Sequence, residues 1–406
     1  MKGVASAYWI DVKGKLDPNG TSTADARGIL LDAAAHAEPP LVVFIVYDLP
    51  NRDCHAYASN GEICCAYNDD GTCDYDNSGD CAAGLDQGGK QTYSTRLQCL
   101  DEYKTTYVDP FAAILAEFEG VVPVALILEP DSLPNFATNL DDPRCGNIGT
   151  KNAYELGIAY AVEALKAAAP SAHIYLDAGH GGWLGWEDNL ESFASTVASL
   201  GVEDQLRGFA TNTANYQPLG EPCADGVDCI TGPGASSACC DDPCGLLSQY
   251  NRGQNQGSTR ERNSQLQRLR SRPFSTRQNE HEYARLLVDA MAAAMPGFAP
   301  KVVIDSGRNG NPGARTDCAS WCNPRDAGAG AVPTAVTRDP DVVDAYFWLK
   351  TPGESDGCTA LLPSADDEWG CASVDSIGTA AGEPYAPEAG HWYDYQIKML
   401  AEFADM

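Results

Sequence analysis

The chain has 406 residues, and 44% of them are hydrophobic, which is enough to bury a large core. Lys and Arg number 27 against 57 Asp and Glu, so the formal net charge is -30. This balance argues against a binder of duplex nucleic acid, which needs a basic face, and against an anionic membrane surface. No apolar run approaches the roughly 18 residues that span a bilayer. The acidity favours an uncharged or cationic ligand.

Sixteen cysteines are too many for a reduced cytosolic enzyme. The pairs Cys64-Cys65 and Cys239-Cys240 are adjacent and no paired CxxC motifs occur, which favours disulfides over zinc. We therefore expect a secreted, extracellular protein. The chain begins Met1-Lys2-Gly3 without an apolar signal segment, so we expect a mature or trimmed form from which the signal peptide is absent.

Seven short apolar or β-branched runs occur along the chain, and we expect each to form a strand. They are residues 6–12, 41–47, 121–128, 172–177, 207–212, 301–305 and 343–349. Helical patterns alternate with them, for example at residues 153–169 and 280–295. This alternation predicts an α/β fold with a parallel sheet or barrel covered on both faces.

Polar residues follow every one of these runs. In chain order they are Asp11, then Asp48, Arg52 and Asp53, then Glu129 and Asp131, then Asp177 and His180, then Asn212 and Asn215, then Asp305 and Arg308, and finally Lys350, Glu354 and Asp356. The carboxyl ends of barrel strands form one face, where active sites lie. Strands also end at polar turns for structural reasons alone, but seven such ends favour a shared site.

Two segments interrupt the pattern, residues 62–99 and 216–278. Each holds five cysteines among polar residues, and each is too long for an ordinary loop. We interpret them as disulfide-stapled insertions on the rim of one catalytic domain spanning residues 1–406. If all ten cysteines are oxidised, at least one bridge must join the two insertions.

Aromatic and acidic residues in the strand-end loops suggest the chemistry. Trp183 and Trp186 lie in a glycine-rich turn, where ligand platforms are the better interpretation than core packing; for Trp9 and Trp321 a core role is nearly as plausible. Asp131 follows the most apolar strand, so burial should raise its pKa and keep it protonated as an acid. Taken alone, any one Asp here could equally be a turn cap or an ion-pair partner.

Long sequence blocks then resemble the signature blocks of glycoside hydrolase family 6. They are YDLPNRDCHAYASNGE (47–62), LILEPDSLPNFATNL (126–140), YLDAGHGGWLGW (175–186), RGFATNTANY (207–216), SGRNG (306–310), WCN (321–323) and WLKTPGESDGC (348–358). The resemblance implies a distorted seven-stranded β/α barrel that hydrolyses β-1,4-glucan with inversion, without a metal or organic cofactor. It also implies cellulose and cello-oligosaccharides as the partners, and we expect a monomer.

The resemblance assigns roles to single residues. Asp131 matches the general acid, Asp53 the aspartate that keeps it protonated, and Tyr47 the tyrosine that distorts the sugar ring. Ser59 matches the serine that holds the water chain, and Asp356 matches the best base, directly or through waters. The residues that match substrate-binding positions, or lie beside them, are Trp9, Asp11, Arg52, Asp177, His180, Trp183, Trp186, Asn215, Trp321, Lys350 and Glu354.

The resemblance also implies two disulfides, Cys54 with Cys145 and Cys322 with Cys371. Cys318 and Cys358 have no counterpart, and we expect them to pair and to pin the loop that carries Asp356.

Long loops roof the cleft in the exo-acting members. The stretch from Lys350 to Cys371 is long here, and the loop after Asp53 is extended and stapled. We therefore expect a cellobiohydrolase that releases cellobiose from non-reducing ends through a tunnel. An endoglucanase with an open cleft is the close alternative, and a non-catalytic glucan-binding protein is the distant one.

Overall fold

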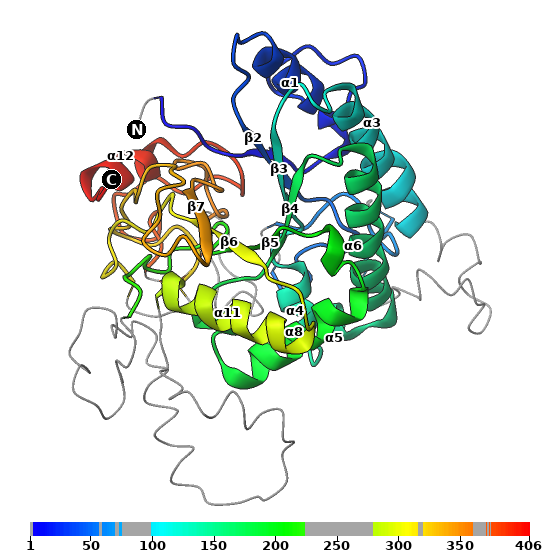
Figure 1. Ribbon diagram of the computed structural model, residues 1–406. Coiled ribbons are helices and arrows are strands. Elements are labelled where there is room, and N and C mark those ends of the chain that lie inside the picture. The colour runs from blue at the N-terminus through cyan, green and yellow to red at the C-terminus, as the bar shows by residue number, and fades with distance from the viewer. Residues whose placement is uncertain are drawn as a thin grey trace, which may run out of the picture.

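The computed structural model describes residues 3–56, 59–69, 73–74, 99–223, 279–315, 320–359, 371, 373 and 375–406. Seven parallel strands form a curled half-barrel whose order follows the chain, β1 to β7 (Figure 1). They are β1 (Tyr8–Ile10), β2 (Val42–Val46), β3 (Val124–Leu128), β4 (His173–Asp177), β5 (Gly208–Thr211), β6 (Lys301–Asp305) and β7 (Val343–Phe347). Each strand lies within one of the seven predicted runs, so the predicted fold class is confirmed.

The two edge strands approach each other where the barrel would close. The backbone N–H of Ala7 donates to the Trp348 carbonyl at 2.9 Å, and the Trp9 indole N–H donates to the Leu349 carbonyl at 2.9 Å. These bonds bring the loop after β7 beside β1. Residues separated by more than 300 positions therefore meet at one face.

Helices cover the outside of the sheet (Figure 1). The α-helices are α1 (Ala26–Ala34), α3 (Asp109–Glu117), α4 (Ser132–Thr138), α5 (Pro143–Gly146), α6 (Ile148–Ala168), α7 (Gly181–Leu184), α8 (Glu187–Leu200), α11 (Glu280–Ala294) and α12 (Asp394–Glu402). Shorter segments are η1 (Lys13–Lys15) and η3 (Glu203–Gln205), both 3-10 helices, and η2 (Tyr103–Val108), a π-helix. Asn147 and Asn279 accept N-capping hydrogen bonds, which explains where α6 and α11 begin.

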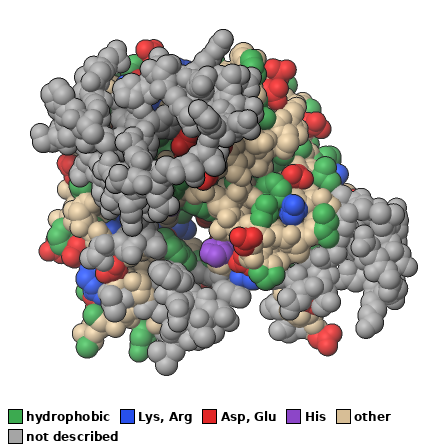
Figure 2. Space-filling view, turned by 90° about the horizontal axis from the view of Figure 1, so that it is seen from below, with side chains coloured by type: hydrophobic (Ala, Val, Ile, Leu, Met, Phe, Trp, Pro, Cys, Tyr) green, Lys and Arg blue, Asp and Glu red, His purple; other side chains and the backbone are tan. Residues whose placement is uncertain are grey.

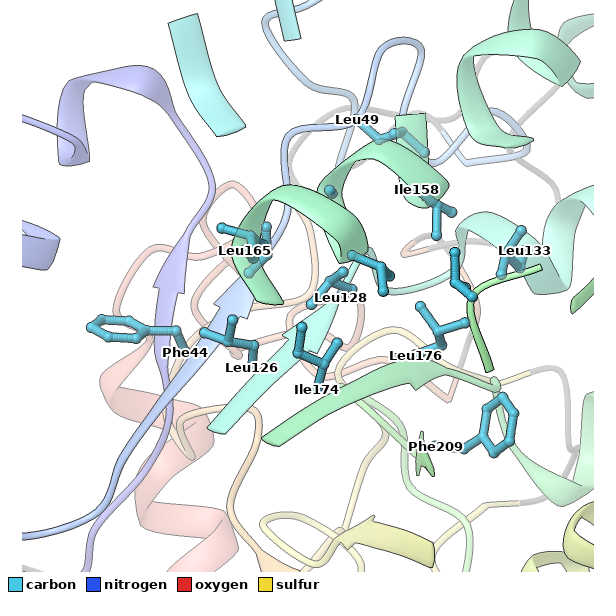
Figure 3. Close-up of a cluster of buried hydrophobic side chains, with 14 of the residues drawn as sticks. Phe44, Leu49, Leu126, Leu128, Leu133, Ile158, Leu165, Ile174, Leu176 and Phe209 are labelled. Atoms are coloured by element: carbon cyan, nitrogen blue, oxygen red, sulfur yellow. The ribbon is translucent and has the colours of Figure 1, made fainter. Parts of the chain in front are cut away.

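Strands β2 to β6 are buried on both faces, as their continuous apolar runs predict, whereas the edge strands β1 and β7 are partly exposed. On the outer face, Phe44, Leu126 and Ile174 pack beneath α6, as Figure 3 shows. On the inner face, Val43, Ile45, Ala125 and Ile127 form a second cluster inside the barrel. No helix among the described residues is long and apolar enough to span a membrane.

Most of both predicted insertions, and any bridge between them, lies outside the described residues. At the start of the first insertion, Cys64 forms a disulfide with Cys73. On the face of the molecule that Figure 2 shows, the coloured basic side chains are scattered among acidic and apolar ones and form no continuous basic patch.

Two of the three expected disulfide pairings form. Cys54 is bonded to Cys145, and Cys322 is bonded to Cys371. The expected third pairing is wrong for the part of the chain that the structure describes, because Cys358 has a free thiol there. Its intended partner, Cys318, lies outside the described residues.

Candidate active site

A cavity of about 850 Å³ opens at the carboxyl ends of the strands. The predicted site residues on its wall are Trp9, Asp11, Tyr47, Arg52, Asp53, Ser59, Asp131, His180, Trp183, Trp186, Asn215, Trp321, Lys350 and Asp356. They come from the ends of all seven strands: Trp9 lies on β1 itself, and Trp321 lies in the loop after β6. The strand ends therefore build one shared cavity, as the sequence predicts.

Asp131 lies at the point where β3 turns into α4. Its backbone is left-handed, with φ at 61°, and its carboxyl group makes no capping hydrogen bond to α4. The turn therefore directs the carboxyl group to the cavity instead of using it as a cap. Burial raises the pKa of Asp131 well above its usual range, and the charges of Asp53 and Asp177 raise it further.

Asp177 supports Asp131 from behind the cavity wall. One oxygen of its carboxylate accepts hydrogen bonds from the backbone N–H groups of Asp131, at 3.0 Å, and Gly179, at 3.1 Å. Burial raises the pKa of Asp177 to about 6. The Asp177 side chain was expected to bind substrate, but it lies at the end of β4 and outside the cavity lining.

Asp53 faces the same cavity from the loop after β2. The Ser59 hydroxyl donates a short hydrogen bond to its carboxylate. Burial raises the pKa of Asp53, and the hydrogen bond from Ser59 opposes that rise. The adjacent Cys54–Cys145 disulfide ties this loop to α5, the short helix that comes after α4.

Asp356 is held as a buried ion pair. One of its oxygens accepts from the Arg308 guanidinium at 2.7 Å. The other accepts from the Tyr216 hydroxyl at 2.5 Å and from the Asn323 backbone N–H at 2.8 Å. Because both oxygens are already bonded, the side chain of Asp356 is fixed in place at the cavity wall.

Aromatic rings form two parts of the wall. On one side, the Trp9 ring meets Tyr47 edge-on at 5.3 Å, and the Lys350 ammonium lies 4.7 Å from the centre of the Trp9 ring. On the other side, the Trp183 indole N–H donates to the Thr138 hydroxyl at 2.9 Å, which fixes the ring. Such rings match the apolar faces of sugars in size and shape.

Three further residues that were predicted to bind substrate form hydrogen bonds or ion pairs within the protein. Arg52 lines the cavity, but its guanidinium donates to the backbone carbonyls of Ser59, at 3.0 Å, and Asp11, at 2.6 Å, and to that of Tyr47. Glu354 lies outside the lining and pairs with Lys350 at 2.9 Å. The Asp11 carboxylate pairs with Lys15. Arg52 therefore holds two loops together from within the wall.

Sequence reasoning missed part of the lining. The missed residues are His55, Ala56, Asn60, Asn135, Asn139, Gly182, Thr213, Ala214, Ser355, Ala389 and Gly390. Most of them lie inside the quoted strand-end blocks, so the blocks themselves were the signal. Ala389 and Gly390 come from the segment before α12, which follows no strand and carries no such signal.

The site combines Asp131, whose pKa is raised, with further carboxyl groups on the wall of the same cavity. Burial lowers the pKa of His180 to about 3, so this ring is neutral near pH 7 and offers hydrogen bonds without charge. Among the described residues, no group of three His, Cys, Asp or Glu could hold a metal ion. The arrangement can donate a proton from Asp131 to an oxygen atom of a bound ligand.

Comparisons with known proteins agree with this geometry. The model of the family described as "Glycosyl hydrolases family 6" matches residues 1–77, 75–228 and 255–404. The 1,4-beta-D-glucan cellobiohydrolase C of Emericella nidulans is 33% identical over 404 residues, which cover 98% of this chain and 68% of that protein. Exoglucanase 3 of Agaricus bisporus is 33% identical over 406 residues, covering 99% of this chain and 70% of that protein.

Solved structures share the fold. The catalytic core domain of the cellobiohydrolase Cel6A from Chaetomium thermophilum aligns with a TM-score of 0.68 at 26% identity, covering 99% of this chain and 88% of that one. The same figures hold for cellobiohydrolase II (Cel6A) from Humicola insolens in complex with glucose and cellotetraose.

Proposed function

The chain belongs to glycosyl hydrolases family 6, and we propose that it is a cellobiohydrolase that hydrolyses the β-1,4-glucosidic bonds of cellulose with inversion, using Asp131 as the acid. The observation that carries the proposal is the environment of Asp131. This carboxyl group lines the cavity, and burial together with two neighbouring carboxylates raises its pKa. A carboxylic acid that stays protonated at the working pH is what departure of a sugar alkoxide requires.

In the proposed reaction, Asp131 gives its proton to the glycosidic oxygen as the C–O bond breaks. The positive charge that develops on the sugar ring is stabilised by Asp53, whose carboxylate faces the same cavity. Tyr47, fixed between Trp9 and Arg52, presses the ring toward the flattened shape of the transition state.

Water attacks the opposite face of the sugar, which gives inversion. We propose that Ser59 holds this water and that Asp356 receives its proton through further water molecules. Support comes from the bonding of Asp356, whose oxygens are occupied by Arg308, Tyr216 and Asn323. A relay lets the carboxylate attract the proton without first giving up these partners.

We propose exo attack from the non-reducing end, with cellobiose as the main product. Three links join the two loops beside the acid: the Cys54–Cys145 disulfide, the His55–Asp142 pair at 2.9 Å, and the Arg144–Asn60 hydrogen bond at 3.2 Å. Loops held together in this way lose less entropy when they enclose a glucan chain. An open-cleft endoglucanase of the same family is the alternative.

Product release measured against viscosity tests the exo mode. On amorphous cellulose and carboxymethyl cellulose in parallel, we expect mostly soluble cellobiose with a slow loss of viscosity. Rapid loss of viscosity with mixed oligosaccharides would replace the exo proposal with the endoglucanase.

We further propose that the protein is secreted and acts as a monomer with a single domain over residues 1–406. The disulfides Cys54–Cys145 and Cys322–Cys371 support an oxidising location. Size-exclusion chromatography with light scattering tests the monomer, and a mass near twice 43.2 kDa would overturn it.

A further inference from the structure

The segment that leads into α12 holds the loop between Lys350 and Asp356. The backbone N–H of Tyr393 donates to the Gly353 carbonyl at 2.7 Å, and that of Ser355 donates to the His391 carbonyl at 2.9 Å. The backbone N–H of Gly390 returns a bond to the Ser355 carbonyl at 2.9 Å. Residues near the C-terminus therefore act as the scaffold for a loop that carries proposed catalytic and binding groups.

Gln396, on the first turn of α12, extends this scaffold into the interior. Its side chain is completely buried. The amide oxygen accepts from the Gly353 backbone N–H at 3.1 Å. The amide nitrogen donates to the Asn323 side-chain oxygen at 2.8 Å and to the Tyr216 hydroxyl oxygen at 3.4 Å. One side chain thus joins three loops, those after β5, β6 and β7.

Two of these partners are also the partners of Asp356. The Tyr216 hydroxyl and the Asn323 backbone N–H both donate to the same Asp356 oxygen. The Asn323 side-chain oxygen, which Gln396 bonds, also accepts from the Asp356 backbone N–H at 3.0 Å. Asp356 itself does not touch Gln396 by any of these bonds. The effect of Gln396 is therefore indirect and geometric.

We propose that Gln396 is a positioning residue that sets the place and orientation of the Asp356 carboxylate. This inference rests on the proposed function, in which Asp356 attracts the proton of the attacking water. Buried hydrogen bonds through Tyr216 and Asn323 connect Gln396 to the Asp356 carboxylate. A shift of about 1 Å in the position of a catalytic group can lower the rate roughly 100-fold.

An amide is the group that satisfies these partners. It offers an acceptor to the Gly353 N–H and a donor to the Asn323 oxygen at the same time. A methionine of similar length offers neither, and would leave both buried groups without this partner. A glutamate keeps the acceptor, but it sets a second oxygen against the Asn323 oxygen and adds negative charge close to Asp356.

The test compares Gln396→Met, Gln396→Glu and a control, Tyr395→Phe, on soluble cello-oligosaccharides. Tyr395 is the adjacent, exposed residue of α12, and its variant removes a hydroxyl while every hydrogen bond of Gln396 stays in place. For Gln396→Met we expect kcat to fall about 10-fold, with KM within about twofold, because Trp9 and Trp183 still bind the substrate. The control should match the wild type.

The pH profile provides a readout that a purely structural role would not move. In Gln396→Glu, a negative charge would lie two hydrogen bonds from Asp356, through the Tyr216 hydroxyl, so the acidic limb of kcat/KM should move to higher pH. Rates are expressed per mole of folded enzyme, from circular dichroism at each pH. If Gln396→Met does not fold, the acidic limb of Gln396→Glu decides the question.

Two results overturn the inference. One is a wild-type kcat in Gln396→Met, and the other is an unmoved acidic limb in Gln396→Glu. An Asp356→Asn variant separates this failure from failure of the proposed function. If Asp356→Asn is inactive while both Gln396 variants behave as wild type, only the inference about Gln396 is wrong. If Asp356→Asn keeps full activity, the proposed role of Asp356 is wrong as well.

Discussion

The backbone N–H of Asp131 donates to the carboxylate of Asp177 at 3.0 Å, so the charge of one acid lies directly behind the other. Asp177 is the last residue of β4, and Asp131 follows the neighbouring strand β3. Burial is the main cause of the raised pKa of Asp131, and the charges of Asp53 and Asp177 add to it. The pairing of β3 with β4 thus places Asp177 where its charge raises the pKa of the proposed acid, Asp131.

Replacing Asp177 with Asn should move the alkaline limb of kcat/KM to lower pH by about one unit. The amide oxygen can still accept from the Asp131 N–H, but the negative charge that favours the protonated acid is gone. Because burial raises the pKa of Asp177 only to about 6, its charge is present across the alkaline limb of the wild type. Rate measurements from pH 4 to 9 check this expectation.

Asp188→Asn is the matched control, since it removes an exposed charge from the first turn of α8. Its profile should equal that of the wild type. An alkaline limb that stays in place in Asp177→Asn would show that Asp177 does not influence the acid.

Stability should fall as the pH rises from about 4 to 8. Burial raises the pKa of Glu129 and Glu280 to about 7, and that of Asp305 to about 6, whereas unfolded carboxyl groups titrate near about 4. The folded state therefore binds more protons than the unfolded state in this window, and each unit of pH removes stability. We expect Tm to be about 5 °C lower at pH 8 than at pH 5.

Glu280→Gln tests the cause of that slope. The Glu280 carboxylate accepts from the Gly181 backbone N–H at 2.8 Å, and a glutamine oxygen can replace it there. The difference in Tm between pH 5 and pH 8 should narrow in this variant, while Glu187→Gln, at an exposed position on α8, should leave it unchanged. A wild-type Tm that rises toward pH 8 would contradict the account.

The Cys54–Cys145 disulfide should contribute both stability and enclosure. It closes a sequence separation of 91 residues, so replacing both cysteines with serine should cost about 3 kcal/mol of unfolding free energy. The loop that carries Asp53 and Ser59 should also move more freely. Denaturant unfolding measures the loss of stability, and the ratio of soluble to insoluble reducing ends measures the loss of enclosure. An unchanged ratio would show that the disulfide does not help to enclose the glucan chain.

Trp183→Ala should raise KM for cello-oligosaccharides about 10-fold with a smaller change in kcat, because a stacking platform binds substrate and transition state alike. The indole is oriented by Thr138, so Thr138→Val should raise KM by only about two- to threefold. Isothermal titration calorimetry with cello-oligosaccharides, in a variant background that lacks activity, should show the same loss as a weaker binding affinity. Equal affinity in Trp183→Ala and the wild type would mean that the ring serves packing alone.

Much of the framework was predictable because it rests on local patterns. Apolar runs such as residues 121–128 mark strands buried on both faces, and the polar residue after each run marks the shared cavity face. Asp131 and Asp53 could be placed on the wall in this way. The family blocks then supplied two disulfide pairings that periodicity alone could not give.

Other features depend on contacts between distant residues and have no local signal. Gln396 meets Tyr216 across 180 positions, and the Tyr103 hydroxyl of the π-helix donates to Glu129 from a different element. Asp177 and Glu354 carry the side chains expected of ligand-binding residues, but their oxygens serve the Asp131 N–H and the Lys350 ammonium. Only the three-dimensional arrangement distinguishes a wall residue from the residue that supports it.

The acid role of Asp131 is tested most directly by Asp131→Asn on two substrates, cellulose and a cellobioside with a good leaving group. The variant keeps the shape of the side chain but has no proton to donate. We expect turnover of cellulose to fall by about 100-fold or more, and turnover of the activated substrate to fall much less, because its leaving group needs little protonation. Near-normal turnover of cellulose, or equal losses on both substrates, would contradict the assignment of Asp131 as the acid.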